Sequence, residues 1–154
     1  MVDSIDQATR SAVMARVRGK NTRPELIVRK LVFAAGYRYR LHVRTLPGSP
    51  DLVFPGRKKV IFVHGCFWHR HDNCNLARMP KSRVEFWSDK LSGNKARDAR
   101  NYDALRQAGW RVHVVWECEL RDLATLEEAL RAFLGAAGGV PKLGSSKISK
   151  IGLN

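Results

Sequence analysis

The apolar positions of the chain predict a small sheet built around one hairpin. Residues 60–63 are all apolar, as expected for a strand that is covered on both faces. The short apolar segment 51–54 precedes them in the chain. A Pro-Gly pair lies between the two segments and is typical of a tight turn. The two strands of this hairpin would place Asp51 and His64 near the same end of the sheet.

Two further segments complete the predicted sheet. Residues 37–43 alternate strictly between apolar or aromatic side chains and Arg or His. This alternation predicts a half-exposed strand with a basic outer face. Residues 111–117 predict another strand.

Capping signals and helical spacing predict helices before, between and after these strands. Capping boxes begin helices at Ser4 and Thr22, the second with Pro in its first turn. Residues 84–108 predict two helices that are separated at Gly93, and residues 123–134 predict an amphipathic closing helix. The resulting order predicts an α/β fold in which helices flank a small central mixed sheet.

We expect one folded domain with an extension at each end. A length of 154 residues suits a single hydrophobic core. Residues 1–20 predict a basic helical arm, residues 21–135 the folded domain, and residues 136–154 a flexible basic tail rich in Gly, Ser and Lys. The outer face of the arm carries Arg16 and Arg18, and this face either lies on DNA or is simply solvated.

The charge of the chain indicates a polyanionic partner. Lys and Arg total 28 against 14 Asp and Glu, which gives a formal net charge of +14. Such an excess favours nucleic acid. An anionic membrane surface is the alternative, but the sequence has no strongly apolar helix face to insert. Without a bilayer-length apolar run or a signal peptide, we expect a cytoplasmic, nucleoid-associated protein with no membrane partner.

Three cysteines and a histidine have a spacing typical of metal ligands. Cys66, His71 and Cys74 form a compact trio, and Cys118 follows the last predicted strand. Four such ligands would make a closed tetrahedral zinc site that orders a loop of little apolar content. The alternatives are three free thiols beside a surface histidine, or His69 as the ligand in place of His71.

A second set of polar residues, around Asp51, suits phosphodiester hydrolysis. This reaction needs an activated water and charge neutralisation, which two Mg²⁺ ions can supply. Asp51 at a strand edge is a natural oxygen ligand for such an ion. The usual endonuclease pattern continues with Asp/Glu-x-Lys on the next strand, where this chain has Phe62-Val63-His64. From the residues alone, Asp51 can also be a turn residue, His64 a core histidine and Glu25 part of a helix cap.

The order Glu25, Pro50-Asp51 and F-V-H-G-C-F-W-H at residues 62–69 resembles the very short patch repair (Vsr-type) DNA mismatch endonucleases. The resemblance implies a restriction-endonuclease-like fold and an enzyme that nicks one strand beside a T·G mismatch left by deamination of 5-methylcytosine. It implies mismatched double-stranded DNA as the partner of a monomer, with other mismatch-repair proteins as further partners. The rival interpretations are a restriction-type endonuclease of the same fold and a zinc-containing DNA-binding module that does not cut.

The resemblance also implies roles in catalysis. Asp51 and the backbone carbonyl of Val63 match Mg²⁺ ligands. His69 matches the general base, a role that histidine suits as a residue type because the unperturbed imidazole titrates near neutrality. His64 and Glu25 match supporting residues around the phosphate and the metal.

Further residues match a structural metal site and DNA contacts. The resemblance implies one Zn²⁺ held by Cys66, His71, Cys74 and Cys118. Aromatic side chains that pry open the mismatched base step match Phe67, Trp68 and Trp87. For Trp87, the alternative is inward packing beside Phe86. The basic residues expected to bind DNA are Arg16, Arg18, Lys20, Arg23, Lys81 and Arg83.

Overall fold

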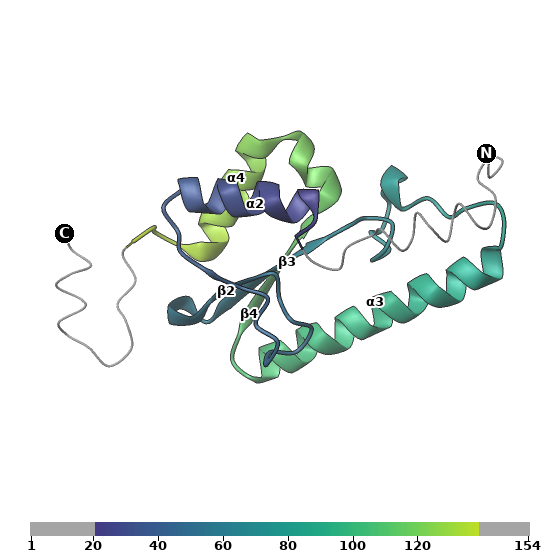
Figure 1. Cartoon of the computed structure of the whole chain (residues 1–154), viewed down its shortest axis with the longest axis horizontal. Helices are drawn as coiled ribbons and strands as arrows, with labels where there is room; N and C mark the ends of the chain where they lie inside the picture. Colours follow the sequence, from purple (N-terminus) through teal and green to yellow (C-terminus); the bar gives the residue numbers. More distant parts are fainter. Residues whose placement is uncertain (1–20, 139–154) are drawn as a thin grey trace.

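A four-stranded mixed sheet lies at the centre of the computed structural model, which describes residues 21–138 (Figure 1). The strand order is β1-β2-β3-β4. Both β1–β2 and β2–β3 pair antiparallel, whereas β3 and β4 pair parallel. The strands are β1 (Arg40–Leu41), β2 (Leu52–Phe54), β3 (Lys59–His64) and β4 (Arg111–Trp116). The predicted arm at 1–20 and residues 139–154 of the predicted tail lie outside the described residues.

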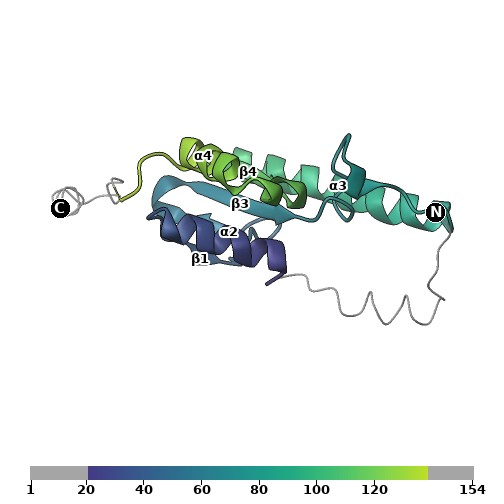
Figure 2. The same cartoon turned by 90° about the horizontal axis from the view of Figure 1, so that it is seen from above.

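Helices cover both faces of this sheet. α2 (Arg23–Ala34) and α4 (Leu123–Leu134) lie on one face, and α3 (Val84–Gln107) lies on the other (Figures 1 and 2). Short 3-10 turns are η1 (Pro55–Arg57), η2 (Asn75–Ala77) and η3 (Glu117–Arg121). The predicted mixed sheet with flanking helices is therefore confirmed. None of the helices described between residues 21 and 138 is long and apolar enough to cross a membrane.

The two faces of the sheet bury separate hydrophobic clusters. One cluster joins the sheet to α2 and α4 through Val28, Val32, Leu52, Phe54, Ile61, Val115, Leu126, Leu130 and Leu134. The other joins it to α3 through Val53, Val60, Phe62 and Leu105. Because successive side chains of a strand point to opposite faces, the continuous apolar sequences of β2 and β3 fill both clusters. This packing fixes the hairpin whose open end carries Asp51 and His64.

The start of α2 brings Glu25 to the same end of the molecule. The Thr22 hydroxyl accepts the backbone N–H of Glu25 at 3.3 Å, which confirms Thr22 as the N-cap of the helix. The carboxylate of Glu25 accepts the N–H of Asn21 at 3.0 Å. The same carboxylate also contacts Arg29 and His42. Glu25 therefore takes part in the helix start and also faces the polar residues near Asp51.

The prediction that Gly93 separates two helices is wrong, because α3 is one helix of 24 residues. Gly93 is exposed, and nothing lies within 4 Å of the place where its Cβ would be. The helix is anchored on either side of this position by the buried residues Leu91 and Leu105. An interior glycine costs a helix only about 1 kcal/mol relative to alanine. That cost is too small to end a helix that packs along a sheet.

The predicted strand at 37–43 is shorter than expected. Only Arg40 and Leu41 pair with β2, and Leu41 remains 41% exposed instead of facing the core. The strand ends because His42 adopts a left-handed backbone conformation, with φ of +47°. His42 thereby places its Nε2 atom 2.8 Å from Oε2 of Glu25.

Candidate active site and metal centre

Asp51 lies at the open end of the hairpin, where β2 begins and β3 ends. Its Oδ2 accepts the backbone N–H of Val63 at 2.7 Å, which holds the carboxylate across the end of the sheet. Asp51, Val63 and His64 line a cavity of about 720 Å³, and His69 lines it as well. The structure therefore brings the predicted catalytic residues of the hairpin and the following loop into one place.

Glu25 and His42 stand beside Asp51. One ligand atom from each of these three residues lies within 4.8 Å of the other two. Glu25 is only 1% exposed. Loss of water, together with the charge of Glu25, raises the pKa of Asp51 from 3.8 to about 7, although the N–H of Val63 favours the ionised form. Two acids gathered at one buried end of a sheet fit a divalent cation with oxygen ligands, which would offset their repulsion.

Two histidines form a parallel stack in the same cavity. The ring centroids of His64 and His69 are 3.6 Å apart, and their planes differ by 5°. Nδ1 of His69 lies 2.5 Å from Oδ2 of Asp98. Nδ1 of His64 lies 3.0 Å from the hydroxyl of Tyr102. Burial and then the charge of His69 lower the pKa of His64 to about 3, so His64 is neutral at physiological pH.

Four residues that contact these side chains were not predicted from the sequence. Asp98 and Tyr102 both come from α3, one helical turn apart, so that both reach the histidine stack. Their separation of four residues was the signal in the sequence that both side chains lie on the same face of the helix. Arg29 and His42 hold Glu25, and Arg29 is likewise four residues beyond it. His42 carried no signal, because its role depends on the turn of the backbone after β1.

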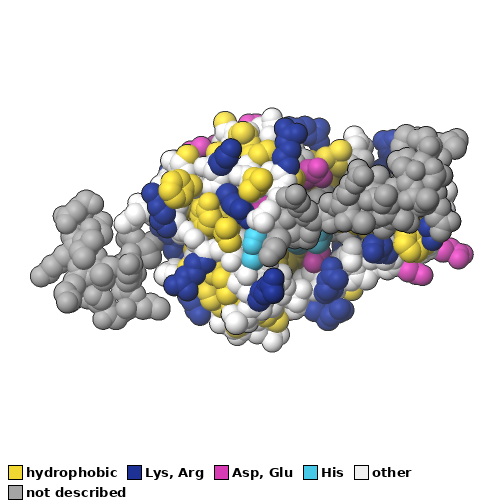
Figure 3. Space-filling model, viewed as in Figure 1, with side chains coloured by type: hydrophobic (Ala, Val, Ile, Leu, Met, Phe, Trp, Pro, Cys, Tyr) yellow, Lys and Arg dark blue, Asp and Glu magenta, His cyan; other side chains and the backbone are white. Residues whose placement is uncertain are grey.

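Arginines from two elements border the cavity. Arg44 from the loop after β1 and Arg97 from α3 both line it, and both are exposed. The loop approaches α3 closely at Gly48, where a Cβ would lie 3.0 Å from the side chain of Asn101. Figure 3 shows Lys and Arg side chains around a histidine that reaches the surface on this face. This arrangement suits a substrate that carries phosphates.

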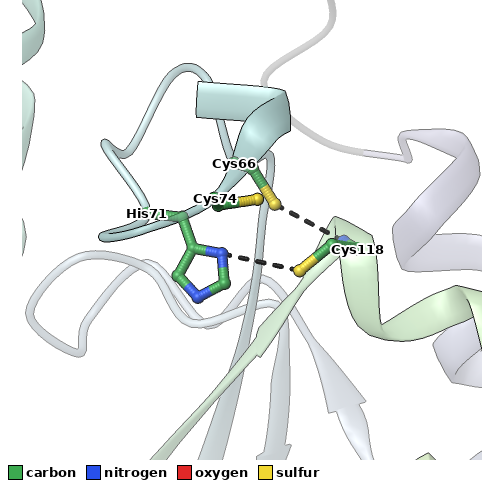
Figure 4. Close-up of side chains that lie close together, drawn as sticks. All are labelled: Cys66, His71, Cys74 and Cys118. Atoms are coloured by element: carbon green, nitrogen blue, oxygen red, sulfur yellow. Dashed lines mark hydrogen bonds between the residues drawn. The ribbon is translucent and has the colours of Figure 1, made fainter. Parts of the chain in front are cut away.

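The predicted zinc ligands converge on a single point (Figure 4). Each predicted ligand offers one atom, and these atoms all lie within 4.8 Å of one another. The four residues are Cys66, His71, Cys74 and Cys118. Sγ of Cys118 lies 3.5 Å from Nδ1 of His71, and the backbone N–H of Cys118 donates to Sγ of Cys66 at 3.4 Å. His71 belongs to this cluster and stacks on Trp116 with a centroid distance of 4.2 Å. His69 instead belongs to the stack with His64.

The ligand set of this cluster fits a tetrahedral metal ion. Three thiols and one imidazole are ligands found in structural zinc sites. Burial raises the pKa of Cys66 to about 12, which means that the thiolate form needs a nearby positive charge. A cation bound here would supply that charge and would tie the loop after β3 to η3, where Cys118 lies.

The three predicted wedge aromatics form one cluster next to the candidate metal ligands. The ring centroids of Phe67 and Trp68 are 5.1 Å apart, and each ring also contacts Trp87. Phe67 and Trp68 are half-buried, whereas Trp87 is only 5% exposed. Trp87 also packs against Phe86 at 5.2 Å, as in the alternative interpretation. Trp87 therefore supports the other two rings from α3.

The basic residues predicted to bind DNA lie partly within the described range. Arg23, Lys81 and Arg83 are exposed. The guanidinium of Arg83 lies over the ring of Phe86, 4.4 Å from its centroid, at the start of α3. Outside the described residues are Arg16, Arg18 and Lys20.

Comparison with known proteins assigns the chain to a family. A family profile described as DNA mismatch endonuclease Vsr matches residues 2–76, which include Asp51 and the histidine stack. The Type II nicking enzyme V.XorIIP of Xanthomonas oryzae is 54% identical over 134 residues, which cover 87% of this chain and 98% of that protein. The DNA mismatch endonuclease Vsr of Escherichia coli K12 is 43% identical over 131 residues, or 84% of this chain and 83% of that protein.

The Type II nicking enzyme V.NmeAIP of Neisseria meningitidis is 43% identical over 130 residues, which cover 84% of this chain and 92% of that protein. These similarities confirm the resemblance that residues 62–69 carry. The chain therefore belongs to the Vsr family and is a DNA endonuclease.

Proposed function

We propose that this endonuclease nicks one strand of double-stranded DNA beside a T·G mismatch of the kind left by deamination of 5-methylcytosine, in a Mg²⁺-dependent reaction. The observation that carries the proposal is the meeting of Asp51, His64 and His69 in one cavity bordered by arginines. The names of the relatives, a mismatch endonuclease and nicking enzymes, support the same reaction class. We also propose that the sheet with Asp51 at the open end of its hairpin is a restriction-endonuclease-like fold.

The carboxylates at the end of the hairpin would hold the metal. Asp51 accepts the N–H of Val63 through Oδ2, and its carboxylate would be the principal oxygen ligand of the cation. The carbonyl of Val63 would supply a further oxygen contact. Glu25, which Arg29 and His42 hold in place, would support the water molecules on the metal. Two Mg²⁺ ions, which we propose as the cofactor, would neutralise charge on the phosphate and stabilise the leaving oxygen. Arg44 and Arg97 bind neighbouring phosphates and hold the strand in place.

His69 takes the proton of the attacking water. Because Nδ1 of His69 donates to Asp98, the lone pair on Nε2 is left to accept that proton. The oxygen of the water bonds to phosphorus, one P–O ester bond breaks, and the departing sugar oxygen takes a proton from a solvent water molecule. The carboxylate of Asp98 stabilises the imidazolium that forms on His69.

The metal centre and the aromatic cluster position the mismatch. One Zn²⁺ at the Cys66–Cys118 cluster orders the loop that carries Phe67, Trp68 and His69. The amide of Asn94 donates to the carbonyl of Trp68 at 3.1 Å and fixes the same loop to α3. The rings of Phe67 and Trp68 then enter the base stack, which costs least where a mismatch already weakens it.

The proposal is tested by comparing Asp51→Ala with Asp103→Ala, a control at an exposed position of α3. The substrates are duplexes that carry one T·G pair in randomised flanking sequence and the same duplexes with T·A. The wild type and Asp103→Ala should nick the T·G duplexes in Mg²⁺, whereas Asp51→Ala should bind them without nicking. Cutting of T·A duplexes at an equal rate would favour a restriction-type enzyme, and binding without cutting by the wild type would favour a DNA-binding module.

A further inference from the structure

The two stacked histidines have different partners on the same helix. His69 faces a carboxylate, Asp98, and His64 faces a hydroxyl, Tyr102. We propose that Tyr102 is a positioning residue that holds His64 as the tautomer with its proton on Nε2, so that the stack contains one proton acceptor and one hydrogen-bond donor. This inference rests on the proposed function, because it names the part that His64 plays in that reaction.

The partner of His69 determines where its proton lies. A carboxylate accepts hydrogen bonds and donates none when ionised, so the short contact of 2.5 Å places a proton on Nδ1 of His69. Neutral His69 then has a lone pair on Nε2. This is the tautomer that a general base requires.

The hydroxyl of Tyr102 imposes the opposite arrangement on His64. Burial raises the pKa of Tyr102, so its O–H keeps the proton. Within residues 21–138, the Nδ1 atom of His64 is the hydrogen-bond partner found for this hydroxyl. If Tyr102 accepted a proton from Nδ1 instead, its own O–H would have no protein acceptor among the described residues, whereas donation to Nδ1 gives it one. Tyr102 therefore donates, and the proton of neutral His64 lies on Nε2.

Packing fixes the ring of Tyr102 in the position that this hydrogen bond needs. The ring meets Phe62 edge to face, with centroids 5.3 Å apart, and lies 6.1 Å from the ring of His64. Tyr102 lines a second cavity of about 370 Å³, which it shares with His69 and Asp98. It does not line the larger cavity around Asp51. Tyr102 therefore acts through His64 and not on the substrate.

The chemistry of a phosphate explains why the two histidines should differ. Two lone pairs side by side would both repel the negative charge that grows on a phosphate during hydrolysis. A neutral N–H on Nε2 of His64 instead donates to a phosphate or leaving oxygen and costs no charge in a buried site. The stack of 3.6 Å then presents an acceptor and a donor next to each other. Asp98 makes His69 the acceptor, and Tyr102, four residues further along α3, makes His64 the donor.

The tautomer can be measured directly in the protein prepared with added Zn²⁺, without DNA or Mg²⁺. Long-range ¹H–¹⁵N correlation spectra would be recorded for the wild type, Tyr102→Phe and Tyr37→Phe, with His64→Gln to assign the signals. Tyr37 is the matched control, because its hydroxyl bonds to the carbonyl of Gly135, far along the chain from the histidines. His64 should show a protonated Nε2 and an unprotonated Nδ1 in the wild type and in Tyr37→Phe. In Tyr102→Phe the two nitrogens should move toward a mixture of tautomers.

A proton on Nδ1 of His64 in the wild type would overturn the inference, and this result does not depend on the folding of any variant. In single-turnover nicking of T·G duplexes, Tyr102→Phe should be about three- to tenfold slower, the loss expected for one hydrogen bond, with unchanged DNA affinity. A wild-type rate for Tyr102→Phe would also overturn it. If the wild type shows the expected tautomer but nicks no T·G duplex, the tautomer assignment stands and the proposed function fails.

Discussion

Asp51→Asn should make the Mg²⁺-free protein more stable while it abolishes nicking. Asparagine has nearly the same shape as aspartate, and its side-chain oxygen can still accept the N–H of Val63 that Oδ2 accepts at 2.7 Å. The substitution removes the negative charge that lies beside Glu25 at a buried end of the sheet. A residue kept for metal binding is expected to cost stability when the metal is absent.

The size of the effect follows from the pKa of Asp51, which loss of water and then Glu25 raise from 3.8 to about 7. Each pKa unit corresponds to about 1.4 kcal/mol, so the full shift would amount to about 4 kcal/mol. Asp51 is only partly buried, and solvent screening reduces the expected gain to about 2 kcal/mol.

The sign of the pH dependence is fixed by the same values. Below the ordinary pKa of 3.8, Asp51 is protonated in both the folded and the unfolded chain, and its ionisation costs nothing. As the pH rises to about 7, the unfolded chain releases this proton while the folded chain keeps it. The wild type therefore loses stability relative to Asp51→Asn over this interval, and the difference is constant above it.

Urea unfolding of the proteins, prepared with added Zn²⁺ and without Mg²⁺, at about pH 5.5 and about pH 8 measures this difference. The advantage of Asp51→Asn should be larger at the higher pH. The exposed control Asp103→Asn should differ from the wild type by less than about 0.5 kcal/mol at both values. The reasoning is refuted if Asp51→Asn is less stable than the wild type at the higher pH, or if its advantage is the same at both.

Three further predictions concern the metal, the aromatic rings and the phosphates. Cys74→Ala should lower the zinc content well below one ion per chain and disorder the loop that carries His69; elemental analysis that finds the wild-type content would contradict this. Trp68→Ala should reduce the preference for T·G over T·A duplexes by about tenfold or more, since base–aromatic stacking is worth about 1–3 kcal/mol, and an unchanged preference in competition binding would count against the wedge. Arg44→Gln should lower the slope of log affinity against log salt by about one, whereas Arg131→Gln on α4, outside the cavity, should not; equal slopes in the two variants would argue against a phosphate contact.

Features that depend on neighbouring residues in the chain were predictable from the sequence. The apolar runs on either side of a Pro-Gly turn predicted the hairpin, and the hairpin alone brings Asp51 to Val63. Three metal-type ligands lie within residues 66–74, so their convergence required only that the fold add Cys118. The resemblance at residues 62–69 then indicated which histidine belongs to the metal site and which to catalysis.

Features that depend on tertiary packing were not predictable. Asp98 and Tyr102 reach the histidines because α3 lies against the face of the sheet that carries Phe62, and spacing within α3 does not specify that direction. Gly93 was misinterpreted because burial of the helix on either side outweighs the weak helix propensity of glycine. His42 reaches Glu25 through a left-handed backbone conformation that strict alternation of residues 37–43 does not indicate.

The most direct test of the account is strand-specific nicking of paired duplexes that differ only in one T·G or T·A pair, with and without Mg²⁺. The account predicts a single nick beside the mismatch, in the presence of Mg²⁺ and in the T·G duplex alone, with the product lost in Asp51→Ala. Nicking of both duplexes at the same rate, or full nicking by Asp51→Ala, would contradict it.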